Sequence, residues 1–172
     1  MRRTRMLKEL LLIIDMQNDF IDGSLGTEEA KAIVPRVRNK ATAADAIIFT
    51  QDTHGADYLD TQEGKKLPIK HCIKPEHGWE ICDELKPYIT QSNVFEKPTF
   101  GGTNLIDAVA TYDIITLVGL CTDICIISNA LLLKAFYPEK VIVVDSKCCA
   151  GVTPQSHVNA IQAMQSCQIE VR

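Results

Sequence analysis

The feature that most constrains the fold of this chain is the alternation of short apolar runs with longer stretches of helical periodicity. Runs rich in apolar and β-branched residues predict six strands, at 10–14, 46–50, 92–95, 114–118, 141–144 and 169–171. Four intervening segments predict helices, at 27–44, 104–111, 123–136 and 154–166. Runs such as LLLIID and VIVVD are apolar at nearly every position, as in parallel strands that helices cover on both faces. The pattern therefore predicts an α/β fold in three layers, built from right-handed βαβ units.

Length and charge argue against several classes of protein. The chain has 172 residues, which favours a single domain over 1–172 that hides roughly 70% of its extended surface on folding. With 18 basic and 22 acidic side chains, the net charge of -4 predicts no binding to nucleic acid or to a membrane surface. The longest apolar stretch, 10–14, is too short to span a bilayer. No apolar signal-peptide core follows the basic segment MRRTRMLKEL, so we expect neither secretion nor membrane residence.

The cysteine content indicates a reducing compartment. The chain has seven cysteines, an odd number, and none of them forms a C-x-x-C pair. This pattern fits free thiols better than a disulfide framework, so we expect a cytoplasmic protein. For the adjacent Cys148 and Cys149 we expect a packing role, with redox activity as the alternative.

Polar or reactive side chains stand at the carboxyl ends of five predicted strands. They are Asp15, Asp52, Lys97, Cys121 and Asp145. In a parallel sheet these ends share one edge, which is where open α/β sheets bind ligands. We therefore expect the five side chains to converge on a functional site, whereas any one of them alone is as well explained by a strand that simply ends.

Cys125 is the strongest candidate nucleophile. In GLCTDICIISNA, Thr122 is a favourable N-cap and Asp123 suits the first helical turn, which would place Cys125 near the start of a helix. Unpaired backbone N–H groups and a nearby cation lower the pKa of a thiol at such a position. The backbone N–H groups of Cys121 and Cys125 could also stabilise an oxyanion. The alternative is a small buried thiol without a chemical role, which we favour for the Cys121 side chain.

Two further residues complete a candidate catalytic group. Asp15 is a carboxylate at a buried strand end, which can accept a thiol proton and return it to a leaving amine. Lys97 precedes a proline and so lies in extended chain, where its ammonium can hold Asp15 ionised. The alternative for Lys97 is a solvated surface lysine.

A second cluster of ligand-type residues surrounds the long polar segment 51–87, a length typical of functional or disordered loops. It consists of a D-x-H pair and two later residues: Asp52, His54, Glu63 and His71. Nitrogen and oxygen ligands of this kind suit zinc, iron or manganese. The alternative is a hydrogen-bonded loop without metal. We expect the other two histidines, His77 and His157, to lie on the surface.

These motifs together resemble one known family. LLIIDMQNDF, FTQDTH, the lysine of FEKPTFGG and GLCTDICIISNA occur in the order found in the isochorismatase-like cysteine hydrolases. The segment HCI at 71–73 resembles the metal loop of the nicotinamidase branch. The resemblance runs from about residue 10 to the end, and it implies a Rossmann-like αβα sandwich with a six-stranded parallel sheet.

The resemblance also implies the roles of several residues in catalysis. It transfers a catalytic triad onto Asp15, Lys97 and Cys125, and oxyanion donors onto the backbone amides of Cys121 and Cys125. The cis peptide bond of the family would fall between Leu120 and Cys121.

Further residues would bind a metal and the substrate. The metal ligands of nicotinamidases map onto Asp52, His54 and His71, with Glu63 as a fourth ligand in some members. Phe20 matches the aromatic residue that packs on the pyridine ring of the substrate.

The expected function is that of a metal-assisted cysteine amidohydrolase, which cleaves nicotinamide or a similar small carboxamide through a thioester. Three departures from the nicotinamidase pattern bear on the substrate. Pro68 stands where nicotinamidases often have tryptophan, and Pro75-Glu76 replaces the usual Gly-Thr pair after HC. In KPTFGGTNL, the spacing from the lysine to the threonine is shorter than usual. Alternatives are a metal-independent isochorismatase-type or N-carbamoyl hydrolase, and a non-catalytic binding or redox protein with the same fold. The resemblance further implies a homo-oligomer, either a dimer or a tetramer.

Overall fold

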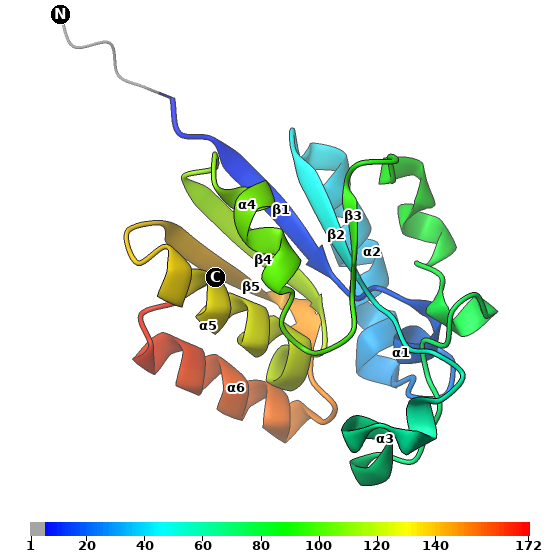
Figure 1. Cartoon of the computed structure of the whole chain (residues 1–172). Coiled ribbons are helices and arrows are strands. Elements are labelled where there is room, and N and C mark those ends of the chain that lie inside the picture. The colour runs from blue at the N-terminus through cyan, green and yellow to red at the C-terminus, as the bar shows by residue number, and fades with distance from the viewer. Residues whose placement is uncertain (1–5) are drawn as a thin grey trace, which may run out of the picture.

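A twisted parallel sheet forms the centre of the protein, with helices on both of its faces (Figure 1). The computed structural model describes residues 6–172, so most of the basic start of the N-terminal segment lies outside the described residues. Within the described part, no helix is both long and apolar enough to cross a membrane.

The strands are β1 (Glu9–Ile14), β2 (Ile47–Asp52), β3 (Val94–Lys97), β4 (Ile114–Leu120), β5 (Val141–Ala150) and β6 (Glu170–Val171). The α-helices are α1 (Asn18–Ile21), α2 (Glu28–Ala43), α3 (Gln62–Lys66), α4 (Ile106–Val109), α5 (Ile127–Phe136) and α6 (Pro154–Ser166). Shorter turns are the 3₁₀ helices η1 (Tyr58–Asp60), η2 (His77–Trp79), η3 (Asp83–Tyr88) and η4 (Thr103–Leu105), and the π-helical turn η5 (Thr122–Ile126). All six predicted strands are present.

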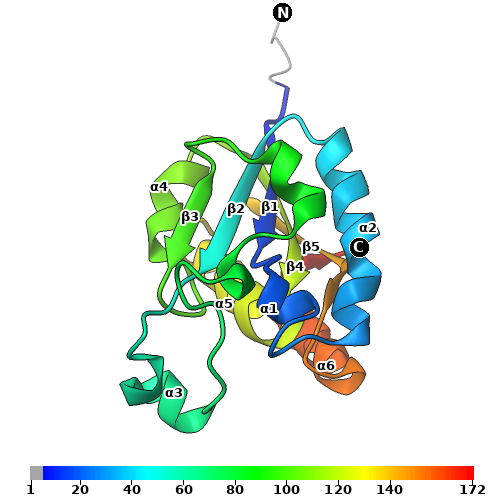
Figure 2. The same ribbon diagram turned by 90° about the vertical axis from the view of Figure 1, so that its right-hand side faces the viewer.

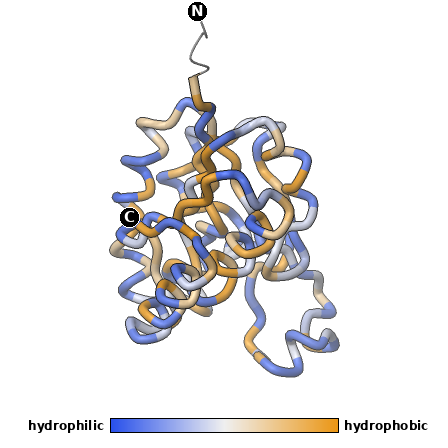
Figure 3. The backbone as a smooth tube through the Cα atoms, turned by 90° about the vertical axis from the view of Figure 1, so that its left-hand side faces the viewer, coloured by the Kyte–Doolittle hydropathy of each residue, from blue (hydrophilic) through white to orange (hydrophobic). Residues whose placement is uncertain are grey.

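The apolar runs are buried on both faces, as their composition predicted. Along β1, Leu11 and Ile13 join a core cluster with α2, whereas Leu10, Leu12 and Ile14 join a second cluster with α4, α5 and α6. Figure 2 shows α2 on one side of the sheet and α4 and α5 on the other. Figure 3 shows hydrophobic residues concentrated in the central strands and hydrophilic ones along the outer helices and loops. This confirms the three-layer αβα sandwich.

The strand order reverses direction at the centre of the sheet, between β1 and β4. The order is β3-β2-β1-β4-β5-β6 and every pairing is parallel. The chain therefore builds outward from β1 in one direction and from β4 in the other, and ligands bind at such a switch point. At this point Gly119 has a φ of 118°, and a Cβ atom there would lie 2.1 Å from the carbonyl oxygen of Ile14. Glycine thus allows β4 to approach the end of β1.

Local capping accounts for the best-predicted helices. α6 begins with Thr153 as N-cap, whose hydroxyl accepts from the backbone N–H of Ser156, and Pro154 occupies its first position. Thr27 caps α2 in the same way. Both helices agree with the predicted ranges to within about one residue.

Three expectations about the elements were wrong. β5 continues to Ala150, so Asp145 lies inside a strand rather than at its end. The predicted helix 123–136 begins instead with η5, and Cys121 rather than Thr122 occupies the N-cap position. The helix predicted at 104–111 is shorter, because its first turn is the 3₁₀ helix η4 and α4 ends at Val109.

Candidate active site

Three side chains from separate elements meet at the carboxyl edge of the sheet. Asp15 follows β1, Lys97 ends β3, and Cys125 lies in η5 just after β4. The Lys97 Nζ atom is 2.7 Å from Asp15 Oδ2 and 3.5 Å from Cys125 Sγ. All three side chains are buried. The structure therefore brings together the three residues that the sequence predicted as a catalytic group.

The carboxylate of Asp15 is oriented by a residue that the sequence analysis did not identify. Asp15 has a φ of 48°, in the left-handed region that aspartate tolerates better than most residues. Thr50 of β2 donates its hydroxyl to Asp15 Oδ1 at 2.5 Å and accepts from the backbone N–H of Asp15 at 3.1 Å. Within its predicted strand Thr50 looked like an ordinary β-branched residue, and no local signal distinguished it.

The expected ionisation of Cys125 was wrong. Burial, and after it the negative charge of Asp15, raise the pKa of Cys125 well above its usual value, although Lys97 opposes them. Burial also raises the pKa of Asp15, again against the charge of Lys97. Both shifts favour the protonated form of the Cys125 thiol and strengthen the carboxylate of Asp15 as the group that accepts its proton.

The turn that carries Cys125 is fixed by side chains that the sequence analysis had not placed there. The peptide bond between Leu120 and Cys121 is cis, as the family resemblance implied. The hydroxyl of Thr122 lies 2.7 Å from Nδ1 of His157 and so does not cap the helix. His157 is accordingly half-buried against this turn rather than a surface residue. Asn129 donates to the carbonyl of Cys125 at 2.8 Å.

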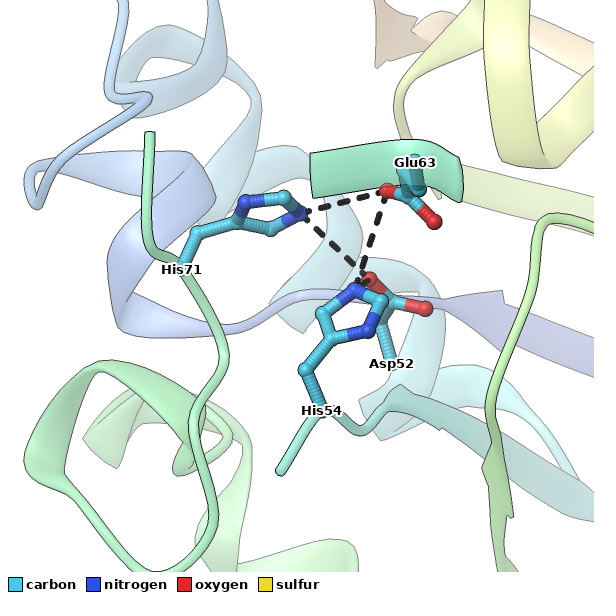
Figure 4. A group of neighbouring side chains, drawn as sticks. All are labelled: Asp52, His54, Glu63 and His71. Atoms are coloured by element: carbon cyan, nitrogen blue, oxygen red, sulfur yellow. Dashed lines mark hydrogen bonds and ion pairs between the residues drawn. The ribbon is translucent and has the colours of Figure 1, made fainter. Parts of the chain in front are cut away.

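Four potential metal ligands gather at one place: Asp52, His54, Glu63 and His71 (Figure 4). They lie beside the catalytic candidates, since Lys97 contacts Asp52. Asp52 ends β2, His54 follows it, Glu63 lies on α3, and His71 lies in the loop after α3. One ligand atom from each residue lies within 4.8 Å of all the others. The long segment that the sequence marked as polar thus returns to the end of β2.

The distances between these atoms fit a single ion. Ligand atoms at zinc bond lengths in a tetrahedron lie roughly 3.3 Å apart. Here the Nε2 atoms of His54 and His71 are 3.7 and 3.6 Å from Glu63 Oε1, and 3.0 and 3.8 Å from Asp52 Oδ2. His71 Nδ1 lies 2.9 Å from the carbonyl oxygen of Ile69, which can only accept. Nδ1 therefore carries the proton and Nε2 is free to bind a metal.

The two groups are joined by direct contacts. Lys97 Nζ contacts Asp52 as well as Asp15, and its distance to Asp52 Oδ1 is 3.2 Å. Asp52 Oδ2 faces the histidines, so its two oxygens serve different neighbours. The side chain of Gln17, which is fully buried, accepts from the backbone N–H of Asp52 at 2.7 Å and donates to its carbonyl at 2.8 Å. Gln17 was not identified from the sequence either.

A pocket of about 360 Å³ opens onto both groups. Its wall includes Cys125, Cys121 and Asp52, and also Phe20 of α1. The ring of Phe20 lies 5.5 Å from that of His71, between centroids. The rest of the wall comes from α3 and from the loops that follow it and Lys97: Gln62, Glu63, Lys66, Leu67, His71, Thr99 and Phe100, with Leu25 and Ile124.

Asp145 does not join this site, contrary to expectation. Its carboxylate lies 2.7 Å from Lys40 of α2 and forms a partly exposed ion pair with it. The reason is the length of β5, which carries the strand end beyond Asp145 to the residues paired with Gly119 and Leu120. Cys148 and Cys149 are buried, in agreement with a packing role, and all seven cysteines are free thiols.

The chain matches a known protein family over almost its whole length. The family model of the isochorismatase domain matches residues 9–172. The chain belongs to the isochorismatase-like hydrolase family. A nicotinamidase from Schizosaccharomyces pombe is 26% identical to this hydrolase, over 94% of the chain and 91% of its own length.

Solved structures share the fold of this isochorismatase-like hydrolase. A pyrazinamidase/nicotinamidase from Streptococcus mutans superposes with a TM-score of 0.83 at 24% identity, covering 95% of this chain and 99% of its own. A pyrazinamidase of Pyrococcus horikoshii in complex with zinc gives a TM-score of 0.80 at 21% identity, covering 96% and 98%. The six-stranded parallel αβα architecture is therefore that of the family.

Proposed function

We propose that this hydrolase is a metal-assisted cysteine amidohydrolase that cleaves a small carboxamide, nicotinamide or a similar compound, to a carboxylic acid and ammonia. One observation carries the proposal. Lys97 Nζ lies within 3.5 Å of Asp15, Asp52 and Cys125, so that it joins the thiol and its proton acceptor to the candidate metal group. The nicotinamidase from Schizosaccharomyces pombe supports an amide substrate.

In the first half of the reaction, Cys125 Sγ attacks the amide carbon while Asp15 accepts the thiol proton. The new S–C bond places negative charge on the former carbonyl oxygen, which the backbone N–H groups of Cys121 and Cys125 stabilise. Asp15 then returns the proton to the nitrogen, the C–N bond breaks, and ammonia leaves. The raised pKa of Asp15 makes its carboxylate a better proton acceptor than an ordinary aspartate, as the attack of the thiol requires.

In the second half, water attacks the thioester carbon and Asp15 accepts a proton from it. The S–C bond breaks, the carboxylic acid leaves, and the proton on Asp15 returns to Cys125. Lys97 keeps its charge throughout, since the neighbouring Asp15, Cys125 and Asp52 raise its pKa although burial opposes this. It therefore offsets the negative charge that moves between Asp15 and Cys125.

Asp52, His54, His71 and Glu63 would hold a divalent metal, zinc or alternatively iron or manganese. A metal held there would supply a Lewis acid that could orient the substrate or a water molecule in the pocket. Phe20 lines the same pocket and would pack against the ring of the substrate.

Ammonia release from a panel of small carboxamides, with and without a chelator, tests the proposal. Wild-type protein should release ammonia and lose this activity with the chelator. Cys125→Ala should keep its fold and metal content but lose turnover, whereas Cys167→Ala, at an exposed cysteine, should match the wild type. Activity without stoichiometric metal would instead support the metal-independent hydrolases, and substantial activity of Cys125→Ala would refute the mechanism. The expected homo-oligomer, a dimer or a tetramer, is tested by light scattering.

A further inference from the structure

The neighbouring strand holds Asp15 through a single hydroxyl group. Thr50 lies in β2, and only 1% of its surface is exposed. Its Oγ1 atom is 2.5 Å from Asp15 Oδ1 and 3.1 Å from the backbone nitrogen of Asp15. The same oxygen therefore contacts both the carboxylate and the backbone of the proposed proton acceptor.

The backbone contact fixes the direction of the hydroxyl hydrogen. The N–H group of Asp15 can only donate, so Thr50 Oγ1 must be the acceptor there. Its one hydrogen is then available to Asp15 Oδ1, and the distance of 2.5 Å is that of a hydrogen bond between a hydroxyl and a carboxylate ion. Asp15 Oδ1 thus has a fixed donor.

The other carboxylate oxygen has different neighbours. Asp15 Oδ2 is 2.7 Å from Lys97 Nζ, which is itself 3.5 Å from Cys125 Sγ. The two oxygens of Asp15 are therefore not equivalent. Oδ1 faces β2, and Oδ2 faces the ammonium that contacts the thiol.

We propose that Thr50 is a positioning residue that assigns the two oxygens of Asp15 different tasks. Thr50 holds Oδ1 as an acceptor, so that Oδ2 exchanges the proton with Cys125. This inference rests on the proposed amidohydrolase function. In the attack on the amide, the S–H bond breaks, an O–H bond forms at Oδ2, and an S–C bond forms, while Thr50 keeps its own proton.

Loss of the hydroxyl leaves the backbone N–H of Asp15 without this acceptor and has two consequences for the carboxylate of Asp15. The carboxylate loses a donor that stabilises its negative charge, so it holds a proton more tightly. It also loses the contact that stops it from rotating, so Oδ2 no longer faces the Lys97 ammonium, which contacts the thiol, in every molecule. The other groups that act on Asp15 stay in place: Lys97 of β3, Asp52 of β2, Cys125 in η5, Cys121 at its N-cap, and Cys72 of the loop after α3.

Thr50→Val tests the inference, because valine has nearly the shape of threonine and lacks the hydroxyl. We expect kcat to fall about tenfold or more while KM changes by less than about twofold. The acid limb of the pH profile of kcat/KM should move up by about one pH unit. Thr50→Ser, which restores the hydroxyl, should recover most of the activity. Thr116→Val makes the same change in β4 and should behave as the wild type.

A second measurement does not depend on turnover. Carbon-13 NMR of labelled aspartate, with Asp15 assigned through Asp15→Asn, follows the ionisation of this carboxyl directly. The pKa of Asp15 should be higher in Thr50→Val than in the wild type, Thr50→Ser and Thr116→Val. If Thr50→Val does not fold, Thr50→Cys, with its weaker donor, should give a smaller shift in the same direction.

The outcomes separate the two proposals. An unchanged Asp15 titration in the folded Thr50 variants would overturn the role of Thr50, even if their activity fell. A wild-type protein that releases no ammonia from any carboxamide would overturn the proposed function, while the NMR titration would still decide whether Thr50 controls Asp15.

Discussion

Replacing Lys97 with methionine should lower the free energy of unfolding by about 3–5 kcal/mol at neutral pH. Methionine keeps most of the volume and the apolar stem of lysine, so the substitution mainly removes the charge. Lys97 is 1% exposed and lies 2.7 Å from Asp15 and 3.2 Å from Asp52. Both carboxylates are buried as well, and the variant leaves them without this cation.

The chain offers a matched control in Lys74. Its ion pair with Glu96 is also 2.7 Å long, but the two side chains are 48% and 43% exposed. Exposed pairs contribute about 0.2–1 kcal/mol, so Lys74→Met should cost no more than that. Urea unfolding of both variants at the same metal content measures the difference. Equal losses would refute the argument that burial makes the Lys97 contacts strong.

The deficit of Lys97→Met should also depend on pH. Lys97 lowers the pKa of Asp15, against the larger effect of burial, so its removal raises that pKa further. The folded variant then keeps the proton on Asp15 to a higher pH than the folded wild type does, while both unfolded chains share the ordinary carboxyl pKa of about 3.9. Its deficit relative to wild type should therefore grow as the pH rises through the raised pKa of Asp15 and shrink on acidification. A deficit independent of pH would assign the loss to another group.

Three further predictions concern the pocket. His71→Ala should weaken zinc binding by about 100-fold or more in competition with a chromophoric chelator, whereas His77→Ala, at an exposed histidine, should not. Alkylation of Cys125, followed by peptide mass spectrometry, should be slow at neutral pH and slower than that of exposed Cys167, because burial and Asp15 raise the pKa of Cys125; fast labelling below about pH 8 would contradict this. Phe20→Ala should raise KM several-fold with less effect on kcat, and an unchanged KM would exclude Phe20 from substrate binding.

The convergence of Asp15, Asp52 and Lys97 was predictable because each stands at the end of an apolar run, and parallel strands share one carboxyl edge. The same rule failed for Asp145. Beyond it, SKCCA is less apolar than VIVVD, yet β5 continues through these residues by pairing with β4 past an irregularity in register. Pairing of this kind depends on the neighbouring strand and leaves no periodic signal in the strand itself.

The sequence by itself determined the order and type of the main elements, since hydrophobic periodicity and capping act between residues a few positions apart. It also determined the candidate ligands and nucleophile, because their chemistry belongs to the residue types. Only the tertiary structure decided that Thr50 holds Asp15 and that Thr122 binds His157, contacts that each join residues 35 positions apart. Only the tertiary structure, likewise, decided that the pKa of Cys125 is raised rather than lowered. Burial and neighbouring charge set the pKa of a thiol, and both arise when distant segments pack together.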